Sequence, residues 1–495
     1  MSDSTSVLVV GAGPVGLSLA CELARRAVPV RIIDKLSAPT AESRAAVVHA
    51  RTLEAFSRMG VVDEIIAAGQ RTTGLQMYAD RVSLGKFALD TVDSPYPFSV
   101  TLPQDETERI LTARLAALGV AVERERELAG FEQDAAGVRA HLKSGEEIRS
   151  DWIAGTDGSH STVRGALGLS LEGSFKGETF LLGDVQADHH LDRSTMHTFF
   201  TADAGPLMVF PMLGRRLRLI GQLDAPAPPT LEELQAIVDH RTAGFRLESA
   251  RWITLFEIHH AQVPHYRVGR GFLAGDAAHV HSPAGGQGMN TGIQDAFNLG
   301  WKLAQAATEG PSPALLDSYN AERHPVAAQV IKVTTATTDA GTATNPLIRR
   351  LRNRAVRVAS GLSPIAHLLA EETEETRVTY RSSPIVESSH RWHRGPQPGD
   401  AAPDVAAVNL HHILARAAGQ IALYIAGREQ APEPSAASNI QRHVLVTDAE
   451  APNSAFNEVI PDPDRAVAAR YGTGENGGLF MIRPDGYLAS RSDLR

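Results

Sequence analysis

The chain has 495 residues, more than one hydrophobic core usually organises, so we expect two or three packed domains. Its 43% hydrophobic and 21% charged residues are ordinary for a globular protein. No apolar stretch approaches the roughly 18 residues of a membrane span. The net charge of −9 argues against nucleic-acid or anionic-membrane partners. Because Cys21 is the only cysteine and we expect no signal peptide, the sequence fits a reducing cytoplasm.

The first forty residues predict a strand, a helix and a second strand. Ser6 to Val10 is a short apolar run typical of a buried parallel strand, and Val28 to Asp34 is another, ending in an acid. Apolar residues at helical spacing lie between them, after Pro14, whose missing N–H costs little in a first helical turn. The segment therefore predicts a β–α–β unit.

The loop of this unit, Gly11-Ala12-Gly13-Pro14-Val15-Gly16, matches the G-x-G-x-x-G pattern. Glycines there let the backbone approach a pyrophosphate, and the helix that follows offers N–H groups and a positive dipole. Asp34 follows about 20 residues later, where a ribose hydroxyl would lie. We therefore predict a dinucleotide site. Two similar patterns, at 269–274 and 472–477, run into strands and are interpreted as structural turns.

Helices are predicted next, near 51–59, near Gly69 and over 105–118, followed by a β-meander over 120–154. Residues 180–260 are strand-rich apart from a helix at 231–240, which suggests a separate sheet on the substrate side. A strand at 269–276 and helices at 292–307 and 317–340 return the chain to the first domain. We expect domains at 1–175 with 265–395, at 176–264 and, after a linker at 396–400, at 396–495.

Two further segments place an acid and glycines between a strand and a helix. They are Gly155 to Arg164, which contains Asp157-Gly158, and Gly275 to His279, which contains Asp276. The second continues into a glycine-rich loop, Pro283 to Gly292, that opens another helix. Backbone N–H groups at such a helix start can bind a second polar edge of a ligand.

Together with the first loop, these segments resemble the class A flavoprotein aromatic hydroxylases, which include p-hydroxybenzoate and phenol hydroxylases, rifampicin monooxygenase and polyketide hydroxylases. The resemblance covers nearly the whole chain. It implies an α/β fold with a Rossmann-like FAD-binding domain of the p-hydroxybenzoate hydroxylase type, a β-sheet substrate domain and a small thioredoxin-like C-terminal domain. That last domain has no cysteine for thiol exchange, so a packing or dimerisation role is expected.

The resemblance also assigns cofactor-binding residues. Gly11 to Gly16 match the pyrophosphate loop, Asp34 the acid on the adenosine ribose, where the family more often has glutamate, and Asp157 and Asp276 match acids around FAD. The further positions that the resemblance assigns to FAD are Lys35, Ser43, Arg44, Gln104, Leu128, Pro283, Gly286, Gly288, Met289 and Asn290. No metal site is expected.

The activity implied by the resemblance is hydroxylation of a phenolic or polycyclic aromatic compound with dioxygen, FAD and transiently bound NADPH or NADH, through a flavin C4a-hydroperoxide. Candidates to activate the phenol are His49, His281 and Pro283, with His279 nearby. Arg215, Arg216 and Arg218 are expected to be solvated rather than to bind an acidic substrate. Four apolar residues are candidates for either a pocket or ordinary core: Met208, Phe210, Met212 and Trp252.

Three alternatives stay open. A Baeyer–Villiger or epoxidising monooxygenase would share every flavin motif, and a non-catalytic flavin-dependent binding protein would share the fold. The residues do not identify the substrate, and either a monomer or a homodimer is compatible with them.

Overall fold

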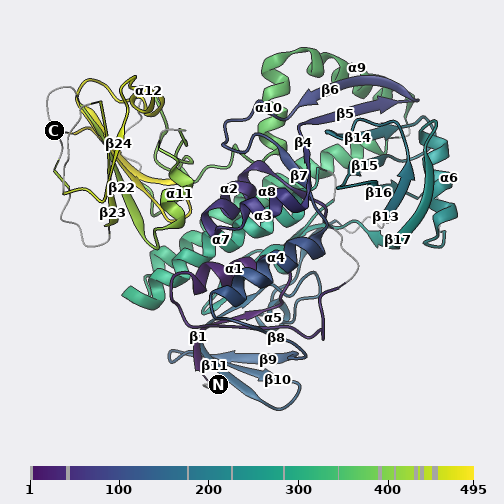
Figure 1. The fold of residues 1–495 in the computed structure, drawn as a ribbon. Coiled ribbons are helices and arrows are strands. Elements are labelled where there is room, and N and C mark those ends of the chain that lie inside the picture. Colours follow the sequence, from purple (N-terminus) through teal and green to yellow (C-terminus); the bar gives the residue numbers. More distant parts are fainter. Residues whose placement is uncertain are drawn as a thin grey trace.

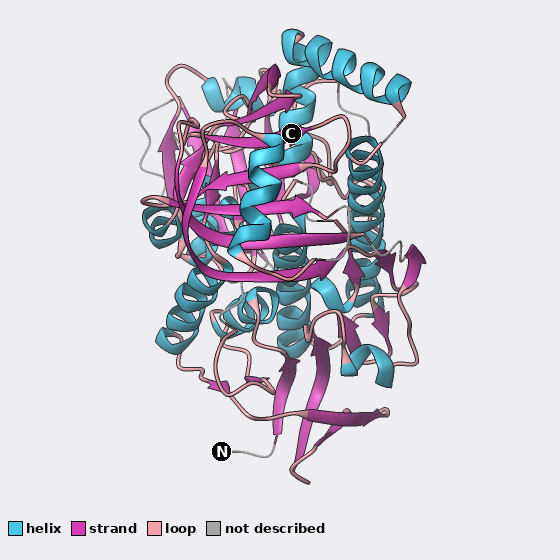
Figure 2. Cartoon of the chain, turned by 90° about the vertical axis from the view of Figure 1, so that its right-hand side faces the viewer, coloured by secondary structure: helices cyan, strands magenta, loops and turns pink. Residues whose placement is uncertain are grey.

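The structure is a computed structural model (Figure 1) that describes residues 4–40, 45–174, 178–223, 227–282, 285–343, 345–387, 393–405, 408–427, 433–434, 440–448 and 455–494. Three parts are visible in it. A Rossmann-like domain carries a second, largely antiparallel sheet on one side and a small C-terminal domain on another. Figure 2 shows the second sheet face-on, above the strands of the first domain.

The first domain is built on a parallel sheet whose strand order is β8-β2-β1-β11-β20. An antiparallel meander extends from β11, as the turn signals predicted, and β19 pairs along the far edge. The strands are β1 (Ser4–Val10), β2 (Val30–Ile33), β8 (Val122–Glu123), β9 (Leu128–Gln133), β10 (Val138–Leu142), β11 (Glu147–Gly155), β19 (Arg267–Val268) and β20 (Gly271–Leu273).

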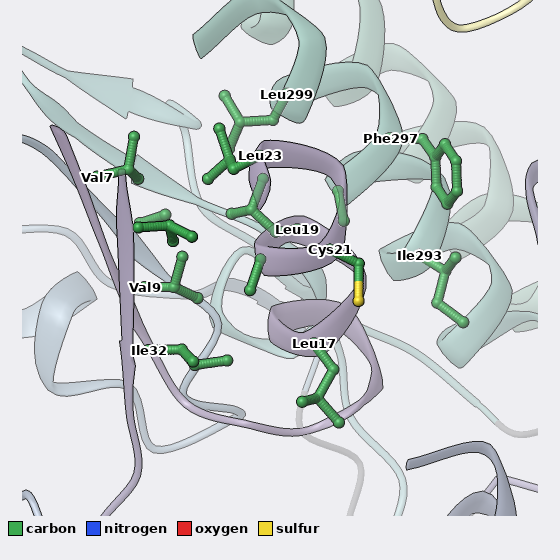
Figure 3. Close-up of a cluster of buried hydrophobic side chains, with 14 of the residues drawn as sticks. Val7, Val9, Leu17, Leu19, Cys21, Leu23, Ile32, Ile293, Phe297 and Leu299 are labelled. Carbon is green, nitrogen blue, oxygen red and sulfur yellow. The ribbon is translucent and has the colours of Figure 1, made fainter. Parts of the chain in front are cut away.

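Helix α1 (Pro14–Ala24) lies between this sheet and α7 (Gln287–Glu309), as Figure 3 shows. Leu17, Leu19 and Leu23 of α1 are fully buried, and each such side chain contributes about 1.5–3 kcal/mol to folding. The two helices come close at Gly300, where an added Cβ would lie 2.8 Å from Glu22 Cβ. Nearer the helix starts, a Cβ added at Gly292 would lie 2.7 Å from Val15 Cγ2, so the first turns of both helices are also close together, and both border the site described below.

The other helices of this domain are α2 (Ala50–Met59), α3 (Val62–Ala68), α4 (Gln104–Ala117), α5 (Thr162–Ala166), α8 (Pro313–Gly341), α9 (Pro346–Gly361) and α10 (Ser363–Thr373), with a 3-10 turn η1 (Gly275–Ala277). Two three-stranded sheets complete it, β3 (Val47–Val48) with β7 (Ser99–Thr101) and β4 (Gln70–Thr72), and β12 (Glu172–Ser174) with β18 (His260–Gln262) and β21 (His279–Val280). Helix α7 begins five residues before the predicted start because Gly286 adopts a left-handed conformation (φ 69°) and caps it.

The second sheet has the order β17-β13-β16-β15-β14-β5-β6, and α6 (Leu231–Arg241) packs on β17 and β15. Its strands are β5 (Gly74–Ala79), β6 (Val82–Ala88), β13 (Thr179–Asp188), β14 (Thr195–Phe200), β15 (Leu207–Pro211), β16 (Arg216–Gln222) and β17 (Arg246–Glu257). The hairpin β5–β6 precedes the expected boundary at residue 176, yet β5 pairs in parallel with β14. The hairpin thus joins the second sheet from an early part of the chain, a long-range pairing that leaves no local sequence signal.

The C-terminal domain has a mixed sheet in the order β24-β23-β22-β25-β26, with β22 and β23 parallel and β25 and β26 antiparallel, as in thioredoxin-like folds. Its elements are α11 (Leu410–Ala415), β22 (Gln420–Ala426), β23 (Ile440–Thr447), β24 (Glu458–Pro461), α12 (Ala466–Tyr471), β25 (Gly477–Ile482) and β26 (Leu488–Ser492). Gly472 ends α12 and Gly477 begins β25, so this second G-x-G-x-x-G pattern is a turn, as interpreted.

A buried ion network joins this domain to the first. The guanidinium of Arg483 binds Glu322 of α8 (2.8 Å) and Asp485 (2.5 Å), and Asp485 accepts from Trp301 Nε1 of α7 (3.0 Å). All four side chains are almost completely shielded from water. Removing one partner of such a cluster leaves charge buried without compensation.

Arg483→Met is therefore expected to lower the free energy of unfolding by about 3–5 kcal/mol. The matched control is Arg470→Met in the same domain, because Arg470 forms an exposed ion pair with Asp93 of the first domain, which is worth about 0–1 kcal/mol. Urea unfolding of both variants measures the difference. Equal losses for the two variants would contradict a stabilising role of the buried network.

Candidate active site

A two-part groove runs along the carboxyl end of the parallel sheet toward the second sheet. The first part, of about 240 Å³, is lined from β1, β2 and the β8–β9 region, and the second, of about 470 Å³, is lined from α7, η1 and the second sheet. The parts meet at five shared residues: Gly13, Thr40, Gln104, Thr156 and Gly158. Ligands of open α/β sheets bind at this end of the strands.

The glycine loop at the start of α1 lines the junction between the two parts of the groove. Gly11 has φ +100°, and a Cβ there would lie 2.5 Å from the Thr156 carbonyl oxygen, while a Cβ at Gly16 would lie 1.9 Å from the Gly11 carbonyl oxygen. By contrast, no atom of the described residues lies within 4 Å of a Cβ built on Gly13, and none of their side chains caps α1. Gly11 and Gly16 thus allow close packing, and Gly13 leaves the helix N-terminus open to the groove.

Several predicted residues line the first part: Ala12, Asp34, Lys35, Leu128 and Asp157. Asp34 Oδ2 accepts from the Ala12 N–H (2.7 Å) and Oδ1 from the Leu36 N–H (2.8 Å), so the acid also holds the loop. Asp157 caps α5, accepting from the Thr162 N–H (2.7 Å), and burial raises its pKa despite these hydrogen bonds. Its carboxylate is engaged within the protein.

The second part brings together Pro14, Val15, Asp276, Gly286, Gly288 and Met289. Opposite them, the second sheet presents an apolar wall of Leu182, Phe210, Ile220 and Phe256. Gln104, at the junction, accepts from the Ala45 N–H (3.3 Å) and donates to Glu108 (2.8 Å). The cavity therefore has one polar, glycine-rich side and one apolar side, the surroundings that a planar aromatic compound requires.

A buried network fixes the loop that enters α7. His49 Nε2 contacts the Gly285 carbonyl oxygen (2.8 Å), and Nδ1 contacts Ser99 Oγ (2.9 Å). Asn290 accepts from the His49 N–H (2.9 Å) and donates to the carbonyls of Gly286 (2.7 Å) and Val47 (2.9 Å). His49 and Asn290 are fully buried, so they hold the loop from behind, and neither belongs to the cavity lining.

The partners in this network require a hydrogen on each ring nitrogen of His49, so the imidazole carries a positive charge. The Gly285 carbonyl can only accept, so Nε2 carries a hydrogen. Ser99 Oγ donates to Glu374 Oε1 (2.6 Å), which leaves Nδ1 to donate to Ser99. Burial opposes the charge, but the contact with Glu374 raises the pKa of His49 above its ordinary value. A protonated His49, paired with Glu374, thus lies beneath the loop.

Glu375 adds a titrating group to this network. It accepts from Thr291 Oγ1 (2.9 Å) and from Gln294 of α7, and burial, opposed by His49, raises its pKa from 4.5 to about 7. Because the pKa of Glu375 is higher in the folded than in the unfolded state, its contribution to folding stability is fully present below pH 4.5 and is lost as the pH rises to about 7. The start of α7 is therefore expected to be more stable in mild acid.

We expect the free energy of unfolding of the wild type, relative to Glu375→Gln, to fall by roughly 3 kcal/mol from pH 4.5 to 7. Denaturant unfolding at several pH values checks this. Glu309→Gln, at the exposed end of α7, serves as the control and should show no such difference. A wild type that gains stability over this range relative to Glu375→Gln would contradict the expectation.

His281 is the candidate histidine that lines the cavity. Its Nδ1 donates to the Ser282 carbonyl (3.1 Å), which leaves Nε2 as an acceptor without a partner among the described residues. Burial and the neighbouring His279 lower its pKa to about 4, so the ring is neutral at physiological pH. Nε2 lies beside the first turn of α7, where a Cβ added at Gly288 would be 3.8 Å away.

The remaining candidates lie elsewhere. Ser43, Arg44 and Pro283 fall outside the described residues. His279 binds the buried Asp295 (2.7 Å). Arg215 is exposed and pairs with Glu248, but Arg218 is fully buried between Asp184 (3.3 Å) and the Trp252 ring, because β16 is an interior strand. The expectation of three solvated arginines was therefore wrong for Arg218.

Sequence reasoning missed Ser99, Thr156 and the pair Glu374–Glu375. Thr156 Oγ1 donates to the carbonyls of Val10 (2.8 Å) and Gly11 (2.9 Å) and so fixes the glycine loop. Glu374 and Glu375 belong to an acidic run after α10 that is typical of a solvated surface, and only the fold carries it beneath α7. Asp157, which follows Thr156 directly, was a visible signal for this region.

These features fit FAD. The open, uncapped start of α1 suits its diphosphate, the first part of the groove suits the adenosine end, and the larger second part suits a planar ring system. A side chain at Gly13 would occupy the space that the diphosphate needs. The residues that would hold the cofactor are those of the two linings.

The comparisons with known proteins agree with this fit. Residues 4–334 match the family model described as FAD binding domain. The 6-methylpretetramide 4-monooxygenase of Streptomyces rimosus is 35% identical over 99% of this chain and 91% of its own length. The pentachlorophenol 4-monooxygenase of Sphingobium chlorophenolicum is 31% identical over 100% and 95%.

Among solved structures, the OxyS anhydrotetracycline hydroxylase from Streptomyces rimosus superposes with a TM-score of 0.77 and 29% identity, covering 99% of this chain and 96% of that chain. The glycine loop, the groove and the two-sided cavity are thus embedded in a chain that is related to these enzymes along nearly its full length. The protein belongs to the class A FAD-dependent aromatic monooxygenases.

Proposed function

We propose that this enzyme hydroxylates a phenolic or polycyclic aromatic compound bound in the second part of the groove. The overall reaction consumes the aromatic compound, dioxygen, NAD(P)H and one proton, and yields the hydroxylated compound, water and NAD(P)⁺. Bound FAD supplies the redox chemistry, accepting hydride from NAD(P)H and activating dioxygen. The observation that carries the proposal is the cavity itself, which is apolar on one side and bordered on the other by a neutral His281 whose Nε2 has no partner among the described residues.

The chain's own residues have three tasks in this proposal. The start of α1, with Gly13 open to the groove, binds the diphosphate, and Asp34 orients the adenosine end. The loop at Gly285 and Gly286, held from behind by His49 and Asn290, positions the ring system. Leu182, Phe210 and Phe256 exclude water, which protects a reactive intermediate from side reactions.

We assign to His281 the role of accepting a hydrogen bond from the substrate hydroxyl. A ring carbon is more easily attacked when its hydroxyl donates to a base, and Nε2 is an acceptor in need of a donor. Since Nε2 lies just beneath the cavity surface beside Gly288, the imidazole must rotate to meet the hydroxyl, and the glycine leaves room for that rotation. The low pKa keeps the ring unprotonated and able to accept.

A screen of phenols and polycyclic phenols tests the function. Purified enzyme loaded with FAD should consume NADPH faster in the presence of a substrate and should add one oxygen atom to it, as mass spectrometry reports. Ring hydroxylation supports the proposal. Insertion of oxygen beside a carbonyl or into a double bond would favour the Baeyer–Villiger or epoxidising alternatives, and intact ligand recovered in every case would favour a flavin-dependent binding protein.

The setting of the enzyme follows from the same features. We propose a cytoplasmic enzyme, because the single cysteine fits a reducing compartment and because NAD(P)H is available there. Cys21 is fully buried in α1, and burial raises its pKa to about 12, so it takes no part in catalysis. A monomer and a homodimer both accommodate a groove that one chain completes.

A further inference from the structure

Helix α9 lies at the outer edge of the second sheet, over β6 (Figure 1). Its inner side is anchored to the sheet. The Arg352 guanidinium lies 4.1 Å from the centre of the Phe200 ring and donates to the carbonyls of Ala340 and Gly341 (3.2 Å each). Val356 packs on the cluster of Leu84 and Phe200. The orientation of the helix about its axis is therefore fixed.

The outer side of α9 is apolar. Leu347, Leu351 and Val358 are 64%, 59% and 50% exposed, and their spacing places them on one face of the helix. Leu362, which follows the helix, extends this face with 45% exposure, and no residue of α9 is buried. A continuous row of exposed large apolar side chains indicates a surface that contacts something other than water.

Arginines flank the apolar row. The helix contains five arginines and no acidic residue, although the whole chain has a net charge of −9. Arg349 and Arg352 bind main-chain carbonyls on the inner side, whereas Arg350, Arg354 and Arg357 are exposed along one border of the row at spacings of four and three residues. None of these three forms an ion pair within the described part of the chain.

We propose that this face, defined as Leu347, Leu351, Val358 and Leu362 with Arg350, Arg354 and Arg357, docks on an anionic lipid surface. A helix with an apolar face and arginines beside it lies in the plane of a membrane interface, its apolar residues among the acyl chains and its cations at the phosphates. No helix among the described residues has the length and apolarity to cross a bilayer, so the contact is peripheral.

Charge and shape favour lipid over a second copy of the chain. A two-fold contact through α9 would set the exposed arginines of one copy near those of the other, which is unfavourable. A single convex helix at the edge of the molecule matches a flat surface. Without the five arginines of α9, the rest of the chain has a net charge more negative than −9. An anionic surface therefore repels the other faces and orients the enzyme with α9 toward it.

Sedimentation with vesicles tests this surface in the FAD-loaded, full-length enzyme. The wild type should bind vesicles of phosphatidylcholine with phosphatidylglycerol, bind pure phosphatidylcholine much less, and dissociate with added salt. The combined variant Arg350→Gln, Arg354→Gln, Arg357→Gln should bind about a hundredfold more weakly, since each cation near an anionic surface is worth about 1 kcal/mol. The variant Leu351→Ser, Val358→Ser should also lose binding.

The matched control is Arg215→Gln, which removes an exposed arginine from the turn before β16 and should leave vesicle binding unchanged. All variants change outward-facing residues, so unaltered thermal unfolding confirms that the fold persists. The proposal is overturned if the wild type does not bind anionic vesicles, or if Arg215→Gln loses as much vesicle binding as the triple arginine variant. A dimer in sedimentation equilibrium that Leu351→Ser, Val358→Ser dissociates would show that a second copy covers the face instead.

Discussion

Replacing Gly13 with aspartate is expected to weaken FAD binding by about a hundredfold or more, because a carboxylate a few ångströms from the diphosphate repels it by roughly 1–4 kcal/mol and also occupies its space. The variant should fold normally, since no atom in the described part of the chain lies within 4 Å of the new Cβ. Aspartate is also a favoured residue at a helix N-cap and interacts well with the helix dipole, so thermal stability should be equal or higher.

Equilibrium titration of the apoprotein with FAD, followed by flavin fluorescence, measures this effect. Gly474→Asp in the C-terminal domain is the matched control, because a Cβ there also meets no atom of the described residues within 4 Å and Gly474 lines neither part of the groove. The control should bind FAD like the wild type. Unchanged affinity in Gly13→Asp would mean that the diphosphate does not bind at the start of α1.

His281→Phe is expected to lower the rate of product formation by about 10²- to 10⁴-fold, the usual contribution of a positioned acid or base. The phenyl ring keeps the shape of the cavity wall but cannot accept a hydrogen bond at the position of Nε2. Because the start of α1 and the first part of the groove are unchanged, the FAD content should remain that of the wild type. Reduced flavin should still react with dioxygen, so more of the NADPH consumed should end as hydrogen peroxide.

The ratio of hydroxylated product to NADPH consumed separates this role from a structural one. A residue that only supports packing would change stability and FAD content, not this ratio. His141→Phe, which changes an exposed histidine on β10, provides the control and should leave the ratio intact. A His281→Phe enzyme with wild-type turnover and coupling would exclude the imidazole as the group that accepts from the substrate hydroxyl.

The elements that the sequence predicted well are those whose signals are local. The β–α–β unit around Gly11 to Gly16, the meander before Gly155 and the helix that ends at Gly60 follow from short-range periodicity and glycine positions. The β5–β6 hairpin was not predicted to join the second sheet, because its partner strand, β14, lies more than a hundred residues later. Local patterns carry no information on such a pairing.

The same distinction explains the site. Residues in glycine-rich motifs could be placed near the groove because the motif itself determines the backbone. The buried carboxylates Glu374 and Glu375 could not, since an acidic run is normally solvated and only tertiary packing brings it to His49. The expectation drawn from the net charge of the whole chain missed the five arginines of α9, although they lie within nine residues of the sequence, at 349–357.

Isotopic labelling of dioxygen shows whether the enzyme transfers an oxygen atom from dioxygen to the aromatic ring. FAD-loaded enzyme is incubated with NADPH, a phenolic substrate from the screen and dioxygen enriched in the heavy isotope, in ordinary water. The proposed reaction places one heavy oxygen atom in each molecule of hydroxylated product. An oxygen atom derived from water, or labelled hydrogen peroxide as the sole oxygen product with every substrate tested, would contradict it.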